Sequence, residues 1–234
     1  MRFYLLLFSG YLVLAAVFAI GYKNKKQFNY PSPVFYKIYG LDASHHQGEV
    51  DWSAVGKTDY KFVYLKATEA ETFRDKRFKE NYKAAKAAGL IVGGYHFWSL
   101  CKSLTNQFEN LKAVIPKAKG DLVPVLDVES TKSCDEKRPE GILMEEMISL
   151  NQLFLDHYGA LPLIYTTSEF STQYPEILEL PNKFWLRSLV GPPLFRKKWF
   201  MWQYYSAGTV DGFLGPVDLN VLKSEVSLDG ILQR

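Results

Sequence analysis

Residues 122–129 read LVPVLDVE, an apolar run of strand length that finishes with two acids. Side chains alternate between the two faces of a strand, so residues two apart share a face. One face carries Val123, Val125, Asp127 and Glu129, and the other carries Leu122, Pro124, Leu126 and Val128. The second set can pack on helices. The first set places two carboxylates at the carboxyl end of the strand.

Similar runs recur along the chain with helical stretches between them. Apolar strand candidates lie at 38–44, 61–67, 90–97, 122–129, 161–166, 184–189, 200–205 and 213–219. Helical spacing of apolar residues follows the second, third and fourth of them, before Gly89, Pro116 and Gly159. Strands that alternate with helices predict parallel pairing. We predict an α/β fold, a modified TIM-like barrel of eight strands with about five helices, (β/α)5(β)3. An open doubly wound sheet is the alternative, but no glycine-rich phosphate loop follows the first strand.

The length of 234 residues suits a single barrel after a short N-terminal segment. Residues 3–22 contain no charged residue and follow Arg2, so residues 1–22 are predicted to be a signal-anchor or a cleaved signal peptide. Residues 23–36 are predicted to be a linker, and residues 37–234 the catalytic domain. Lys23, Lys25 and Lys26 favour cytoplasmic retention of the segment after the run, whereas the function inferred below favours export.

The net charge of +3 does not describe the predicted barrel. Four of the 28 basic residues, Arg2, Lys23, Lys25 and Lys26, precede residue 37, which leaves 24 against 25 acids. The predicted barrel is therefore not expected to carry a basic surface that binds nucleic acid. No metal site is expected either, because the four histidines do not show HxH or HExxH spacing. We predict no cofactor.

Four acids at strand ends are the strongest chemical signal. Asp127 and Glu129 share a face, Asp42 ends the first strand, and Asp218 ends the last strand candidate, a neighbour of the first in a closed barrel. Barrel active sites lie at the carboxyl ends of the strands. Repulsion and burial push the pKa values of paired carboxyls apart, which leaves one protonated as an acid, as glycoside cleavage requires. A structural pair satisfied by arginine or backbone donors is the alternative.

Aromatic residues near the strand ends offer surfaces for sugar rings. Tyr95, Tyr165 and Trp202 each lie near the carboxyl end of a strand candidate. Aromatic faces stack on the apolar faces of sugars, and hydroxyl or indole groups add polar contacts. Core packing is the alternative for each of them.

The segments GLDASHHQGEVDW, FVYLKATEAETFRD, LIVGGYHFW, VPVLDVE and WQYYSAGTVDGFLGPVDLN, in unbroken order from about residue 39 to 222, resemble glycoside hydrolase family 25, the Chalaropsis-type lysozymes. The resemblance implies a modified eight-stranded barrel and an N-acetylmuramidase that hydrolyses the β-1,4 bond between N-acetylmuramic acid and N-acetylglucosamine in peptidoglycan. It makes Glu129 the proton donor, Asp127 the stabilising acid, and Asp42 and Asp218 further active-site acids. Glu69 and Gln203, which lie in matched segments, are predicted to bind substrate. Ala70 stands where the family's KATEG has glycine, which puts the shape of that loop in doubt.

The resemblance leads to a substrate-assisted mechanism. Glu129 protonates the glycosidic oxygen, Asp127 orients the 2-acetamido group, and Glu129 then activates water. A chitinase-like hydrolase of N-acetylglucosamine polymers and an inactive glycan-binding protein are the alternatives. We expect a monomer that is exported, either membrane-anchored with the catalytic domain outside the cytoplasm or secreted after cleavage. Cys101 and Cys134 lie in loops after adjacent strands and are predicted to form a disulfide, the alternative being two free thiols.

Overall fold

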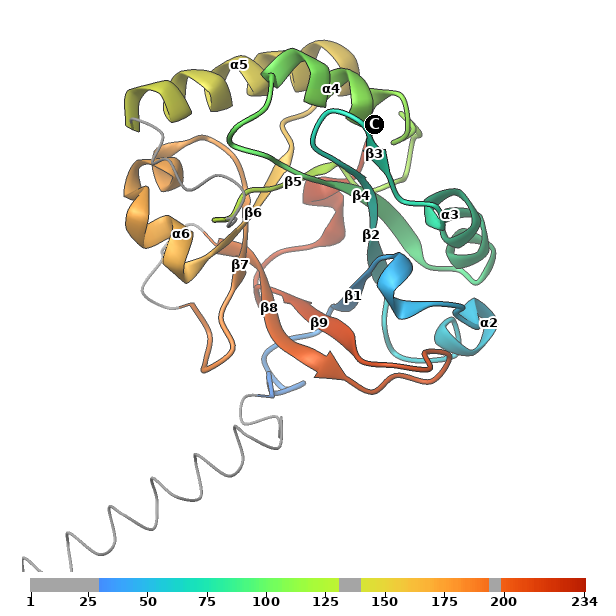
Figure 1. The fold of residues 1–234 in the computed structure, drawn as a ribbon. Helices are drawn as coiled ribbons and strands as arrows, with labels where there is room; N and C mark the ends of the chain where they lie inside the picture. Colours follow the sequence, from blue (N-terminus) through green and yellow to red (C-terminus); the bar gives the residue numbers. More distant parts are fainter. Residues whose placement is uncertain (1–29, 131–139, 194–198) are drawn as a thin grey trace, which may run out of the picture. The chain divides into compact units, whose positions relative to one another are not determined.

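A computed structural model describes residues 30–130, 140–193 and 199–234. In these ranges eight strands close into a barrel, a ninth lies outside it, and five α-helices surround the ring (Figure 1). The barrel strands are β1 (Tyr39–Ala43), β2 (Phe62–Glu69), β4 (Ile91–Phe97), β5 (Val125–Asp127), β6 (Leu163–Thr167), β7 (Phe184–Arg187), β8 (Trp199–Gly208) and β9 (Val217–Leu222). The helices are α2 (Trp52–Val55), α3 (Phe78–Ala87), α4 (Leu104–Lys112), α5 (Glu140–Tyr158) and α6 (Ser168–Gln173). The predicted fold class is confirmed.

Barrel closure depends on β1, which pairs in parallel with β2 and antiparallel with β9. Strand β9 is also antiparallel to β8, whereas the pairings from β2 to β8 within the barrel are parallel. The prediction of parallel pairing is therefore wrong for β9. This strand follows β8 through a short connection without a crossover helix, which permits only an antiparallel return.

Two further differences from the predicted elements lie near the barrel mouth and floor. Strand β3 (Phe73–Arg74) pairs with the end of β2 as a short hairpin, which was not predicted. Strand β5 covers only Val125–Asp127 of the predicted 122–129. Leu122 forms an isolated bridge with Leu232 and belongs to the interior cluster, because the regular alternation of faces begins only after Pro124.

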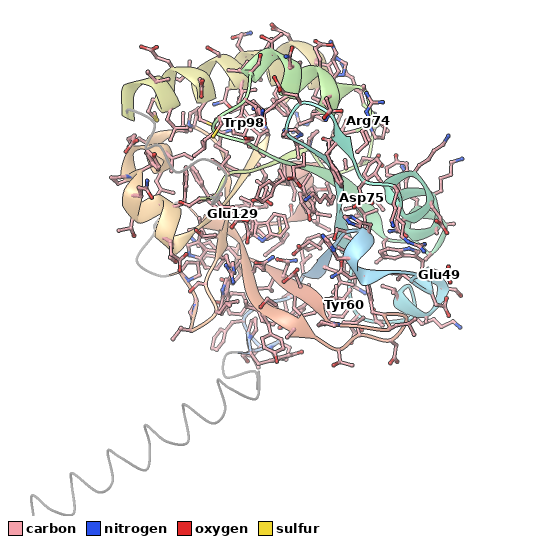
Figure 2. All side chains as sticks on the ribbon, viewed as in Figure 1. Glu49, Tyr60, Arg74, Asp75, Trp98 and Glu129 are labelled. Carbon is pink, nitrogen blue, oxygen red and sulfur yellow. The ribbon has the colours of Figure 1, made fainter. Side chains whose placement is uncertain are left out.

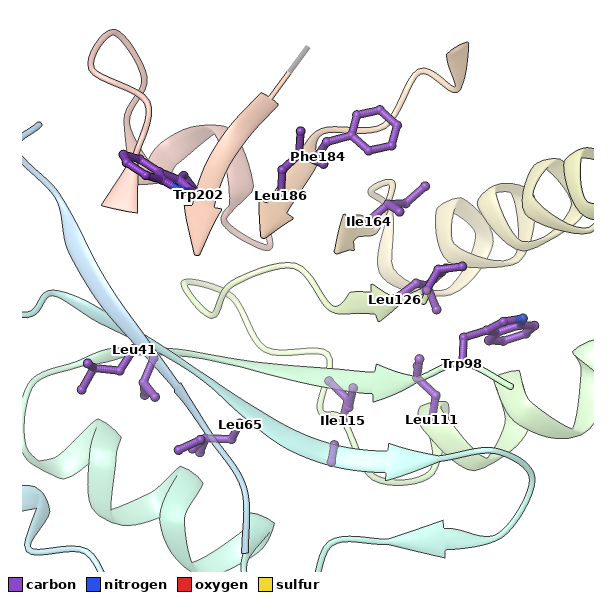
Figure 3. Packing of buried hydrophobic residues seen from close by; sticks show 14 of the residues in the cluster. Leu41, Leu65, Trp98, Leu111, Ile115, Leu126, Ile164, Phe184, Leu186 and Trp202 are labelled. Atoms are coloured by element: carbon purple, nitrogen blue, oxygen red, sulfur yellow. The ribbon is translucent and has the colours of Figure 1, made fainter. Parts of the chain in front are cut away.

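The core has two layers. The larger cluster lies between the strands and the helices, where Leu65, Leu111, Leu126 and Ile164 pack (Figure 3). The smaller cluster fills the interior of the barrel at the end where the parallel strands begin, and it contains Tyr64, Val125, Trp185 and other apolar residues. Gly93 makes room for it, since a Cβ there would lie 2.3 Å from the Tyr64 ring. The interior of the barrel is therefore packed where its parallel strands begin.

Residues 231–233 cover the end of the barrel where the parallel strands begin. After the 3-10 helix η3 (Leu228–Ile231), the Ile231 carbonyl accepts a hydrogen bond from the Val123 amide. The buried Gln233 side chain donates to the Leu122 carbonyl at 2.9 Å and accepts from the Ala118 amide at 3.1 Å. The C-terminal segment thus acts as the floor of the barrel.

The compact unit begins at Pro31, six residues before the predicted start of the catalytic domain at residue 37. The Tyr39 hydroxyl donates to the Pro31 carbonyl at 2.7 Å, and the Tyr36 ring packs edge-on against Trp202. Residues 31–36, the last part of the predicted linker, therefore belong to the compact unit and pack on the barrel. Residues 1–22, predicted to be an anchor or a signal peptide, lie outside the described residues. Across the ranges that are described, we find no helix with the length and apolarity to cross a membrane.

Candidate active site

A cavity of about 260 Å³ opens at the carboxyl ends of the parallel strands. It is lined by Asp42, Lys66, Tyr95, Phe97, Val125, Asp127, Glu129, Tyr165, Trp185, Arg187, Gln203, Ser206 and Asp218. All four predicted catalytic acids are among these residues, together with Tyr95, Tyr165 and Gln203 from the predicted substrate-binding set. The structure therefore brings seven of the nine predicted catalytic and substrate-binding residues to one opening.

Three strands bring the four acids together. Asp127 is the last residue of β5 and Glu129 follows two residues later, next to the end of β5 (Figure 2). Asp42 lies on β1 directly opposite Asp218 on β9. Asp218 was predicted to lie at the end of the last strand, but it is the second residue of β9. It reaches the mouth because β9 is antiparallel, so that its beginning lies beside the carboxyl end of β1.

Asp127 and Glu129 differ in their surroundings. The Asp127 side chain is almost fully buried, and its Oδ1 has no hydrogen-bond partner among the residues that the structure describes. Burial and the neighbouring Glu129 charge raise the pKa of Asp127 well above its ordinary value. Burial also raises the pKa of Glu129, and the Arg187 guanidinium opposes that rise. A raised pKa lets a carboxyl keep its proton nearer to neutral pH, as a general acid must.

The second pair of acids has a more elaborate set of partners. Asp42 Oδ2 accepts hydrogen bonds from Asn220 Nδ2 at 2.7 Å and Gln203 Nε2 at 2.9 Å. Burial raises the pKa of Asp42 to about 6, while these two hydrogen bonds hold it down. Burial and the Asp42 charge raise the pKa of Asp218 to about 8. The two acids that face each other across β1 and β9 therefore have different proton affinities.

Two basic residues at the cavity were not predicted as site residues. Lys66 Nζ lies 2.6 Å from Glu69 Oε2 and above the rings of Phe73 and Phe97. Glu69, predicted to bind substrate, does not line the cavity and instead anchors this lysine. Arg187, the last residue of β7, has no ion pair among the described side chains. A charged residue inside or at the end of an apolar strand was the signal in the sequence for both.

The aromatic lining differs from the prediction at one position. Tyr95, Tyr165, Phe97 and Trp185 line the cavity, whereas Trp202 does not. Trp202 belongs to the outer cluster, and its indole Nε1 donates to the Ser188 carbonyl at 2.8 Å. It cannot face the cavity together with Gln203, because adjacent residues of a strand point to opposite faces. Trp202 therefore does not line the cavity, as its predicted role in substrate binding would require, and Trp185 is a tryptophan that does.

The histidines near the mouth have structural partners. His45 Nδ1 lies 2.7 Å from Asp75 Oδ2, and the same oxygen accepts from the His45 amide at 2.8 Å. Within the described ranges, no group of three histidine, cysteine or acidic residues could hold a metal ion. Cys101 is an exposed residue after β4, whereas Cys134, its predicted disulfide partner, lies outside the described residues.

Comparison with known proteins gives one family. A family model for glycosyl hydrolases family 25 matches residues 41–213. Lysozyme M1 of Streptomyces globisporus is 31% identical over 198 residues, which cover 78% of this chain and 67% of that protein. The YegX protein of Escherichia coli O6:H1 is 29% identical over 225 residues, which cover 90% of this chain and 80% of YegX. The structure of a family 25 glycosyl hydrolase from Bacillus anthracis superposes with a TM-score of 0.74 at 33% identity, covering 80% of this chain and 89% of that one.

Proposed function

Because the chain belongs to family 25 of the glycosyl hydrolases, we propose that its cavity cleaves peptidoglycan by a substrate-assisted reaction with Glu129 as acid and base. The chain is a glycoside hydrolase of the lysozyme type, whose substrate is the glycan strand of peptidoglycan. The bond cleaved is the β-1,4 bond from N-acetylmuramic acid to N-acetylglucosamine. The division of roles among the carboxyls is our proposal.

One observation carries this proposal. Asp127 and Glu129 line the same open cavity, and neither forms an ion pair with a basic side chain in the described part of the chain. If they were a structural pair, both would be neutralised by fixed basic partners. Their raised pKa values and their place in the lining of the cavity instead fit a pair that handles protons.

The reaction then proceeds in two steps. Glu129 gives its proton to the glycosidic oxygen as the C1–O bond breaks, and the carbonyl oxygen of the substrate's 2-acetamido group forms a bond to C1. The acetamido N–H donates to Asp127, whose Oδ1 has no partner in the described protein. Glu129, now ionised, takes a proton from water as the water oxygen attacks C1 and the acetamido oxygen leaves. The first product keeps the anomeric configuration of the substrate.

Replacement of Glu129 by Gln tests the proposal. Glu129→Gln keeps the size of the side chain but has no proton to give, so release of reducing ends from purified peptidoglycan should fall by about 10²–10⁴-fold. Glu169→Gln, which neutralises an exposed acid close enough to influence Glu129, is the matched control and should keep most of the activity. Circular dichroism should show both variants folded.

Three outcomes would contradict parts of the proposal. Near-normal activity of a folded Glu129→Gln variant would remove the acid–base role. Faster cleavage of N-acetylglucosamine oligomers than of peptidoglycan would favour the chitinase-like alternative. NMR detection of an inverted first anomer would exclude attack by the acetamido group.

The catalytic domain is exported, because its substrate lies in the cell wall. We further propose that residues 1–22 hold it at the membrane, on the basis of the 20 uncharged residues at 3–22. Cell fractionation with an antibody to the domain should then find the full-length chain in the membrane fraction. A shortened chain in the medium alone would instead identify residues 1–22 as a cleaved signal peptide.

A further inference from the structure

A chain of buried hydrogen bonds surrounds Asp42 and is not explained by the acid–base roles above. Asn220 is fully buried on β9, and its register partner on β8 is Gln203. Both side-chain amides donate to the same oxygen, Asp42 Oδ2, at 2.7 Å and 2.9 Å. Three neighbouring strands thus converge on one carboxylate oxygen.

A further side chain hydrogen-bonds the oxygen of each amide, and at Asn220 it fixes the orientation of the amide. Trp185 Nε1, which can only donate, lies 2.9 Å from Asn220 Oδ1. If the Asn220 amide were reversed, its N–H group would face the indole N–H, so Nδ2 must point to Asp42. The Tyr165 hydroxyl, which can donate or accept, donates to Gln203 Oε1 at 2.9 Å in the arrangement that directs the Gln203 N–H group to Asp42.

These donors determine where a proton can reside. Asp42 Oδ2 meets two N–H groups, and a proton on that oxygen would displace one of them. Hydrogen bonds to the charged form of a carboxyl favour ionisation. Asp218 lies opposite Asp42 in register, and its side chain receives no hydrogen bond from any described residue. Two carboxyls side by side do not both ionise readily, so the one without donors is the better proton carrier.

We propose that Asn220 and Gln203 are positioning residues that keep Asp42 ionised, so that Asp218 retains the proton and offers a neutral O–H donor to the bound sugar. This inference rests on the proposed function, since it assigns two further roles within the same cavity. It predicts that the sugar group facing Asp218 is a hydrogen-bond acceptor, whereas the group facing Asp42 Oδ1 is a donor.

The electrostatic surroundings of Asp42 and Asp218 agree with an ionised Asp42 and a protonated Asp218. The pKa of Asp42 is raised to about 6 and that of Asp218 to about 8, so that at neutral pH the first is ionised and the second is protonated. Charged and titratable groups from four strands face Asp42 and Asp218. They are Arg187 on β7, Asp127 on β5 with Glu129 just after it, Tyr95 on β4 and Tyr165 on β6. Arg187 lowers the pKa of both acids, so it does not explain why the pKa of Asp42 is lower than that of Asp218.

Two isosteric variants test the assignment. Asp218→Asn replaces a neutral donor by another neutral donor and should keep peptidoglycan cleavage within about tenfold of the wild type. Asp42→Asn replaces an anion by a neutral group and should lower kcat/KM by about 100-fold or more. Equal losses in the two variants, or a larger loss in Asp218→Asn, would overturn the proposal.

The pH profile tests the positioning role of Asn220. Asn220→Leu removes one donor, so the pKa of Asp42 should rise and the acidic limb of kcat/KM against pH should move up by about one unit. Asn151→Leu is the matched control, because Asn151 is also a buried amide but pairs with Asn182, away from the cavity. It should lose stability without moving the limb. An unmoved limb in a folded Asn220→Leu variant would overturn the role.

A titration of the wild-type protein serves if Asn220→Leu does not fold. Carbon-13 NMR of the aspartate carboxyls, assigned with Asp42→Asn and Asp218→Asn, should show Asp42 titrating below Asp218. The reverse order would overturn the inference. This readout needs no substrate, so it stays distinct from failure of the proposed function, which would appear as a wild-type protein that does not cleave peptidoglycan.

Discussion

At the scale of single residues, Ala70 shows how one side chain strains a loop beside the cavity. It has a φ of 46° in the hairpin between β2 and β3, a left-handed backbone conformation that costs residues with a Cβ about 1–2 kcal/mol. Its carbonyl accepts from Asn110 Nδ2 at 3.1 Å and its amide donates to the Phe97 carbonyl at 3.1 Å, and both contacts hold the loop in place. The doubt about this loop that the sequence raised therefore has a physical basis.

Ala70→Gly should stabilise the protein. Glycine adopts positive φ without the steric cost but loses more entropy on folding, so we expect a net gain of about 0.5–1 kcal/mol, or about 1–4 °C in Tm. Ala84→Gly in the helix α3 is the control, and it should lose about 1 kcal/mol. A fall in Tm for Ala70→Gly in thermal unfolding would show that the loop does not carry this strain.

Arg187 moderates the charge of three of the four acids. It lowers the pKa values of Glu129, Asp42 and Asp218. In Arg187→Met these pKa values should rise, so both limbs of the pH profile of kcat/KM should move to higher pH, by about one unit. Lys57→Met, which removes an exposed positive charge outside the cavity, should leave the profile in place. A profile that keeps its position in Arg187→Met would exclude this role.

The site residues differ in how far the sequence could predict them. Alternation along one strand correctly grouped Asp127 with Glu129, because their spacing of two does not depend on the strand's exact position. The same rule could not choose between Trp202 and Gln203, which are adjacent, because the direction of each face depends on the barrel. Asn220 was not predicted, although it lies two residues after Asp218, since its role arises only from neighbours on other strands.

At the scale of elements, the antiparallel β9 closes the barrel that the parallel strands form, and the C-terminal segment covers its floor. The amphipathic patterns predicted α3, α4 and α5, and the apolar runs predicted the barrel strands. The predicted parallel pairing is wrong for β9 because a strand pattern carries no direction, and the signal for an antiparallel return was the short connection after β8, which has no crossover helix. The β2–β3 hairpin was missed because two residues are too few for a pattern.

Gln233 should be essential for the floor of the barrel. Its side chain bonds to Leu122, Ala118 and Pro116, so Gln233→Ala leaves buried backbone groups without partners. We expect a loss of about 1–3 kcal/mol in the free energy of unfolding, measured with urea. The exposed Gln152, whose side chain donates to Asp156, provides the control Gln152→Ala, expected to change stability by less than about 0.5 kcal/mol. Equal effects would show that the floor contributes nothing specific.

At the scale of the whole molecule, the cluster of buried acids links stability to pH. The pKa values of Asp42 and Asp218 are raised in the folded state above the ordinary value of 3.8. The folded protein therefore binds more protons than the unfolded chain between about pH 4 and pH 8, and its stability falls as pH rises through this window. The site thus opposes folding most strongly at neutral and alkaline pH.

This linkage predicts a higher Tm at pH 5 than at pH 8. Asp218→Asn has no charge to bury, so it should raise Tm at pH 8 and reduce the difference between the two pH values. Asp211→Asn, an exposed acid outside the cavity, is the control and should keep the wild-type difference. A wild-type Tm that rises from pH 5 to pH 8, measured by calorimetry in matched ionic strength, would contradict the prediction.

The closure of the barrel has a consequence for how the enzyme is made. Strand β1 begins the ring but needs β9 as a partner, and residues 231–233 form the floor. A nascent chain from which residues 217–233 have not yet emerged therefore lacks both the strand that closes the ring and the segment that covers its other end. The cavity can form only after these residues have joined the rest of the domain, so a partly synthesised chain has no lytic activity.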